Sequence, residues 1–126
     1  MLRLSLFSNL NYRHCRILAI AWMVLIFIMS SQSSVPVSGG WGQDKLMHFI
    51  CYGILGFMLA RSFKNAQEGL SWKQIALVSL IAFAYGASDE FHQSFVPGRE
   101  ASLGDLLADT LGGIAGAMLL RRKTVS

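Results

Sequence analysis

Residues 75–87 read IALVSLIAFAYGA, an uncharged run that lies between Lys73 and Asp89. Three further apolar runs occur along the chain, and polar residues interrupt or flank each of them. A helix rises about 1.5 Å per residue, so a core of about fifteen residues covers about 23 Å of a hydrocarbon layer about 30 Å thick. Each helix must therefore extend into its polar flanks to cross a membrane. We predict one domain, residues 1–126, with helices at approximately 16–32, 45–63, 72–90 and 103–120.

The composition favours a membrane over water as the surroundings of this domain. Of the 126 residues, 53% are hydrophobic and 14% are charged, whereas soluble domains carry about 25% charged residues. The apolar runs are shorter than the stretch of about twenty residues that typically spans a membrane, so a soluble helical core is the competing interpretation. The predicted fold class is all-α, a polytopic membrane protein with a bundle of about four transmembrane helices.

The positions of Lys and Arg support the membrane interpretation. Three of them lie before the core of the first run, three after the second run and three after the fourth, whereas the other two connections hold only Lys45 and Arg99. This alternation follows the positive-inside rule for four spans, and it places both termini in the cytoplasm of a bacterial inner membrane. Because the clusters do not form one basic face, we predict no nucleic-acid partner.

The first apolar run, residues 17–29, has two interpretations. Basic residues precede it, and the serine-rich stretch Ser30–Ser34 follows it. A cleavable signal peptide has the same layout of charge, apolar run and small residues. A retained first helix and a cleaved leader are therefore alternatives.

Two segments hold most of the polar chemistry, residues 44–52 (DKLMHFICY) and residues 89–99 (DEFHQSFVPGR). Asp105 and Asp109 follow, four residues apart and so on one helix face. Ionisable groups at membrane depth are costly, so they usually face the bundle interior and pair with one another. We therefore predict a shared interior site that three polar helix faces enter from the outward side. The faces are those of Asp44, His48 and Tyr52, of Asp89 and Gln93, and of Asp105 and Asp109.

Arg99 is the most suggestive cation of these polar segments, because a guanidinium can hold a phosphate or carboxylate with two hydrogen bonds. The alternative is a structural role, in which Arg99 pairs with Glu100 or Asp105. Asp105 then ties helices together by pairing with Arg99 or Lys45. The histidines and carboxylates lack a metal-ligand spacing such as HExxH, and the chain has no nucleophile motif. We therefore predict no metal and no cofactor, and we assign no catalytic residue.

These residues resemble the VanZ-like family of bacterial membrane proteins. The resemblance runs in the family's order from about residue 17 to residue 120, and the family usually has Asn where this chain has Asp109. It implies a four-helix membrane domain. It also carries over seven candidate site residues, which lie on positions where the family motif matches: Lys45, His48, Asp89, Glu90, Gln93, Arg99 and Asp105. Because the founding member is associated with reduced susceptibility to teicoplanin, it also implies an influence on glycopeptide susceptibility. The matching elements are Ser30-Ser31-Gln32, Asp44-Lys45-x-x-His48-Phe49-x-x-Tyr52-x-x-Leu55-Gly56, Asp89-Glu90-x-x-Gln93-x-Phe95-x-Pro97-Gly98-Arg99 and Asp105-x-x-x-Asp109-x-x-Gly112.

Three functions fit these observations. In the first, the chain binds an amphiphilic envelope lipid or a lipoglycopeptide at its outward polar residues, with Arg99 and Lys45 on the anionic group. In the second, it is a membrane-embedded hydrolase or transferase acting on such a lipid, with Glu90 or Asp89 as general base and His48 as proton partner. In the third, it is a structural scaffold that packs against itself or a larger partner as a homo- or hetero-oligomer. The lipid bilayer is a partner in all three.

Overall fold

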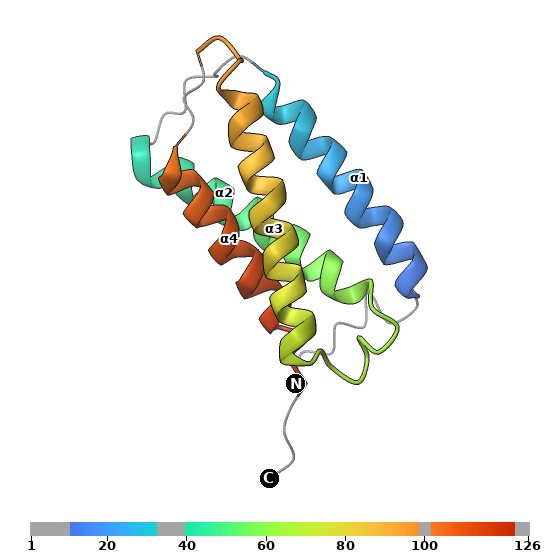
Figure 1. Ribbon diagram of the computed structural model, residues 1–126. Coiled ribbons are helices and arrows are strands. Elements are labelled where there is room, and N and C mark those ends of the chain that lie inside the picture. The colour runs from blue at the N-terminus through green and yellow to red at the C-terminus, as the bar shows by residue number, and fades with distance from the viewer. Residues whose placement is uncertain (1–10, 33–39, 99–101, 123–126) are drawn as a thin grey trace.

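The computed structural model describes residues 11–32, 40–98 and 102–122, with side chains in the second range from residue 45 onward. Within these ranges the chain forms four helices and no strand, which confirms the all-α prediction. Successive helices run in opposite directions, so the bundle has an up-down-up-down arrangement (Figure 1). The helices are α1 (Tyr12–Ser30), α2 (Gly40–Arg61), α3 (Trp72–Gln93) and α4 (Leu103–Met118).

Side-chain caps explain where three of the helices begin. Asn11 accepts a hydrogen bond from the backbone N–H of His14, so α1 starts four residues earlier than the sequence predicted. Ser71 and Gln74 form a reciprocal capping box at the start of α3, and Ser102 caps α4 by accepting from the N–H of Asp105 at 3.3 Å. Each cap satisfies a backbone donor that the first helical turn leaves without a partner.

Helices α2 and α4 approach so closely that their backbones touch. A Cβ atom on Gly112 would lie 2.3 Å from the carbonyl oxygen of Phe49, and one on Gly116 would lie 2.1 Å from that of Gly53. No larger residue fits at either glycine without a shift of the backbone. The pair at 112 and 116 is thus a contact surface between helices of the small-xxx-small kind.

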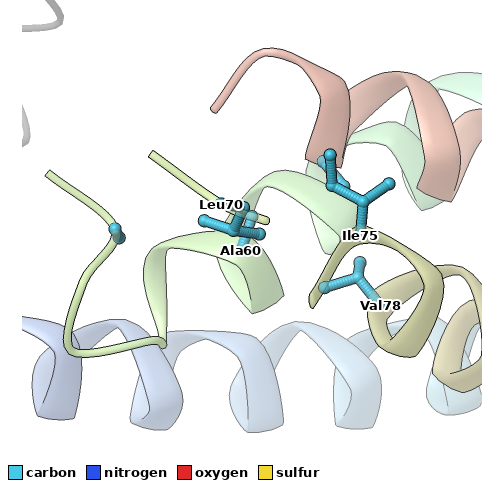
Figure 2. Close-up of a cluster of buried hydrophobic side chains, with 6 residues drawn as sticks. Ala60, Leu70, Ile75 and Val78 are labelled. Atoms are coloured by element: carbon cyan, nitrogen blue, oxygen red, sulfur yellow. The ribbon is translucent and has the colours of Figure 1, made fainter. Parts of the chain in front are cut away.

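A hydrophobic cluster closes the end of the bundle where α2 ends and α3 begins. Figure 2 shows Ala60, Leu70, Ile75 and Val78 together there, and all four side chains are buried. The backbone of Leu70 also pairs with the residues after α4, because its N–H donates to the carbonyl of Leu120 at 2.7 Å and its carbonyl accepts from Arg122. This end of the bundle therefore holds a buried apolar cluster, whereas the opposite end is polar.

Helix α1 is the one helix among the described residues that is both long and apolar enough to cross a membrane. Its 18-residue window has a mean hydropathy of 1.6, and it lies near the amino terminus, where a signal sequence would give the same result. The described ranges thus contain four helices, whereas the prediction of four membrane spans belongs to the proposal below.

Candidate functional site

The centre of the polar end is a contact between α2 and α4. Asp109 is fully buried, and its Oδ1 atom lies 2.8 Å from His48 Nδ1. Gly86 on α3 leaves room for this carboxylate, because a Cβ atom there would lie 3.0 Å from Asp109 Oδ2. Spacing along the chain predicts that Asp109 shares a helix face with Asp105, although Asp109 is not among the seven candidate residues that the family resemblance carries over.

Lys45 and Asp105 extend the contact toward the start of α4. The Lys45 ammonium forms an ion pair with Asp105 Oδ1 and lies 3.4 Å from the hydroxyl of Ser102. The second oxygen of Asp105 lies 3.6 Å from His48 Nε2. A continuous row of polar groups, Lys45, Asp105, His48 and Asp109, thus joins the two helices. The pairing of Lys45 with Asp105 was the structural alternative that the sequence left open.

Helix α3 contributes two adjacent carboxylates, and both are buried. The Tyr52 hydroxyl donates to Asp89 Oδ2 at 3.5 Å, and the backbone N–H of Ser102 donates to Glu90 Oε2 at 2.9 Å. The other oxygen of each residue, Asp89 Oδ1 and Glu90 Oε1, has no hydrogen-bond partner within the described part of the chain, and the same holds for Asp109 Oδ2. Buried carboxylate oxygens of this kind are rare in native proteins and call for a physical explanation.

The end of α1 closes over the last turn of α3. Gln93 is buried, and its side-chain amide donates to the Ser30 hydroxyl at 3.4 Å. His92 Nε2 lies 2.9 Å from the Ser31 hydroxyl, and the imidazole stacks on Phe27 with the ring centroids 4.5 Å apart. Gln93 therefore lies at the edge of the polar end, where it joins α1 to α3.

The structure brings six of the seven predicted site residues to this end of the bundle. The seventh, Arg99, lies outside the described residues. Tyr52 and Asp109, which share helix faces with His48 and Asp105 by their spacing, are not among the seven but take part in the same contacts. We call this set the polar cluster: Lys45, His48, Tyr52, Asp89, Glu90, Gln93, Asp105 and Asp109.

One part of the polar cluster has the composition of a cation site. His48, Glu90 and Asp109 each offer one ligand atom, and these three atoms lie within 4.8 Å of one another. They come from α2, α3 and α4. An imidazole with two carboxylates is a donor set that suits both acid–base chemistry and a divalent metal.

An apolar cavity of about 320 Å³ lies at the other end of the bundle. It is bounded by α1, α2 and α3, and its lining includes Ile20, Leu59 and Val78. Arg16 lies at its edge, where Nε donates to the carbonyl of Ser62 at 3.1 Å. The cavity and the polar cluster are thus separate features of the fold.

Comparison with proteins of curated function and with solved structures gave no match. A comparison with protein-family models matched residues 16–124 to the model described as VanZ/LLP1. The matched range contains α1 from Arg16 onward, the whole of α2, α3 and α4, and every member of the polar cluster. It covers most of the chain. The chain therefore belongs to the VanZ/LLP1 family.

Proposed function

We propose that the chain is a multi-pass protein of the bacterial inner membrane, with both termini in the cytoplasm. Helices α1 to α4 have 19, 22, 22 and 16 residues. At about 1.5 Å per residue they are about 24 to 33 Å long, which is close to the thickness of the hydrocarbon layer. The alternation of basic clusters supports this orientation.

Exposed apolar side chains on every helix support the membrane assignment. Ile20 on α1, Ile50 on α2, Leu80 on α3 and Leu107 on α4 are all exposed. Helix α4 is shorter than α1, with 16 residues. Helices α2 and α3 are less apolar than α1 because their polar residues lower the mean hydropathy of the helix, although Asp89, Glu90 and Gln93 on α3 are buried in the bundle. Polar groups that face the bundle interior are typical of membrane helices with a function.

We further propose that the polar cluster binds the headgroup of an amphiphilic envelope lipid or a lipoglycopeptide. The observation that carries this proposal is the set of three buried carboxylate oxygens, on Asp89, Glu90 and Asp109, without a partner among the described residues. Hydroxyl and amine donors of a headgroup would satisfy them, and the acyl chain would lie along the apolar surface of the helices. Since the Lys45 ammonium already pairs with Asp105, any anionic group of the ligand would depend on Arg99.

Binding is tested with the full chain in lipid nanodiscs and with teicoplanin as the probe. A glycopeptide without an acyl chain serves as the ligand control. Glu90→Met removes both carboxylate oxygens while keeping a side chain of similar length. Glu90→Gln keeps an oxygen that accepts from the N–H of Ser102. Glu68→Gln is the control, because it alters an exposed carboxylate outside the polar cluster. We expect teicoplanin to bind wild type about tenfold more tightly than Glu90→Met, with Glu68→Gln unchanged. Equal affinities for all variants would refute the proposal.

The same variants test an influence on glycopeptide susceptibility in cells. Wild type, Glu90→Gln and Arg99→Ala are expressed in a host without relatives, and their membrane levels are matched by immunoblot. If the polar cluster acts on this phenotype, wild type shifts teicoplanin susceptibility and the two variants do not. A shift of the same size in all three strains would show that the phenotype does not depend on these residues.

A membrane-embedded hydrolase or transferase is the second candidate, and the contact between His48 and Asp109 favours it. A carboxylate on one ring nitrogen orients an imidazole for proton transfer, and Glu90 offers an ionisable oxygen nearby. An enzyme of this kind would lose turnover of a lipid-linked substrate in Glu90→Gln while keeping most of its affinity for that substrate. Equal turnover by wild type and Glu90→Gln would exclude Glu90 as the general base.

A further inference from the structure

Three side chains from three helices converge in the middle of the polar cluster. His48 lies on α2, Glu90 on α3 and Asp109 on α4. One nitrogen of His48 and one oxygen of each carboxylate lie within 4.8 Å of one another. Because the three residues are far apart in the sequence, no local spacing of metal-ligand type could reveal them.

Two carboxylate oxygens at this point lack a donor. Glu90 is 7% exposed and Asp109 is 0% exposed. Glu90 Oε1 and Asp109 Oδ2 have no hydrogen-bond partner within the residues that the structure describes. Removing charged oxygens from water without a compensating donor costs several kcal/mol. A cation bound by the two carboxylate groups would repay that cost.

We propose that His48, Glu90 and Asp109 bind a divalent metal ion, with zinc as the best match. Imidazole nitrogen together with carboxylate oxygen suits zinc better than magnesium, which prefers oxygen ligands and retained water. Zinc–ligand bonds of about 2.0 to 2.2 Å in tetrahedral geometry place ligand atoms about 3.3 Å apart. The donors therefore need to move together by at most about 1.5 Å from their present separation of up to 4.8 Å.

The surrounding contacts fit a ligand set of this kind. His48 Nδ1 faces Asp109 Oδ1 at 2.8 Å, and a metal ion replaces the proton that they share, which is released to solvent. The other ring nitrogen, Nε2, lies 3.6 Å from Asp105 Oδ2. A carboxylate on the outer nitrogen of a metal-bound imidazole holds the ring in position. Likewise, the backbone N–H of Ser102 donates to Glu90 Oε2 and holds that carboxylate in position.

The site would have three protein ligands and an open fourth position. Two carboxylates neutralise the charge of a divalent ion, so the filled site costs less to bury than the carboxylates alone. The open position is the arrangement of zinc sites that bind water or a substrate oxygen. Zinc and the donors of a headgroup would compete for the oxygens of Glu90 and Asp109. Zinc binding is therefore tested without any lipid ligand, so that its failure and the failure of amphiphile binding are separate results.

The first measurement is the zinc content of the full chain purified in detergent with an affinity tag that contains no histidine. After incubation with zinc and removal of free metal, we expect about one zinc ion per chain by elemental mass spectrometry, and a rise in thermal unfolding temperature that magnesium does not reproduce. Zinc content near zero, or equal stabilisation by magnesium, would overturn the proposal.

Ligand identity is tested with Glu90→Gln, Asp109→Asn and, as a matched control, Asp89→Asn. Asp89 is also buried with one oxygen that has no partner, but it is outside the proposed ligand set. We expect at least tenfold weaker zinc binding in the first two variants and wild-type affinity in the control. Unchanged affinity in all three, with intact helical circular dichroism, would place the metal elsewhere and overturn the assignment.

Cobalt provides a readout that does not require any carboxylate variant to fold. Co²⁺ bound to the wild-type chain should give visible absorption bands with the intensity of a four- or five-coordinate site, and zinc should displace them. His48→Gln should shift or remove the bands. Weak bands typical of hydrated, six-coordinate cobalt in the wild type would refute the inference.

Discussion

His48 Nδ1 lies 2.8 Å from Asp109 Oδ1, and this contact joins α2 to α4 inside the polar cluster. His48→Ala should therefore leave the buried carboxylate of Asp109 without its hydrogen bond to the imidazole. Breaking one side of a buried charged pair costs about 3 to 5 kcal/mol. We expect a marked fall in the thermal unfolding temperature of the purified protein in detergent, measured without added metal.

Asp109→Asn is the control for that experiment, and it introduces the residue that is usual in the VanZ-like family. It removes the buried charge, so the double variant His48→Ala, Asp109→Asn should recover part of the stability lost in His48→Ala. Strict additivity of the two single effects would show that the contact contributes no coupling energy.

Gly116→Ala should weaken the packing of α4 on α2. Its new Cβ atom would lie 2.1 Å from the carbonyl oxygen of Gly53, so the helices must separate. Overpacking of this kind typically costs about 1 to 3 kcal/mol. Gly53→Ala is the matched control, because its Cβ would lie 3.6 Å from the nearest atom of α4, the carbonyl oxygen of Gly112. The thermal unfolding temperature of Gly116→Ala in detergent should be well below that of Gly53→Ala. Similar temperatures for the two variants would contradict the described contact between α2 and α4.

Cysteine labelling tests the proposed topology. Glu68 and Ser94 are exposed residues at opposite ends of α3. In a background without Cys15 and Cys51, Ser94→Cys should react with a membrane-impermeant maleimide in intact spheroplasts. Glu68→Cys should react only after lysis. If both cysteines react before lysis, positions 68 and 94 lie on the same side of the membrane. That result would contradict an odd number of membrane crossings between them.

We expect α1 to remain part of the mature protein, because it is packed into the bundle by specific contacts. Trp22 Nε1 donates to the carbonyl of Cys51 at 2.9 Å, and the Tyr85 hydroxyl donates to the carbonyl of Met23. The intact mass of the protein purified from membranes should include residues 12–30. A mass that begins after Ser30 would establish cleavage. Trp22→Phe should lower stability by about 1 kcal/mol through loss of its hydrogen bond.

Local sequence patterns predicted the helices well but not their ends. The apolar runs placed all four helices, whereas Asn11 extended α1 and Gln93 lay beyond the predicted end of α3. Caps and last turns depend on single side-chain hydrogen bonds, which a hydropathy pattern does not contain. Spacing also predicted that Asp105 and Asp109 share a face, although their different partners, Lys45 and His48, depend on how α4 rests on α2.

The sequence by itself determined that this chain is helical, that its polar residues gather in two segments and the start of the last helix, and that it resembles the VanZ-like family. These properties follow from residue type and spacing along one chain. Only the tertiary structure decided that His48, Glu90 and Asp109 meet, and that their carboxylates keep oxygens without hydrogen-bond partners among the described residues. The physical reason is that the three residues lie on three different helices, whose mutual distance is set by close packing at glycines such as Gly86 and Gly112.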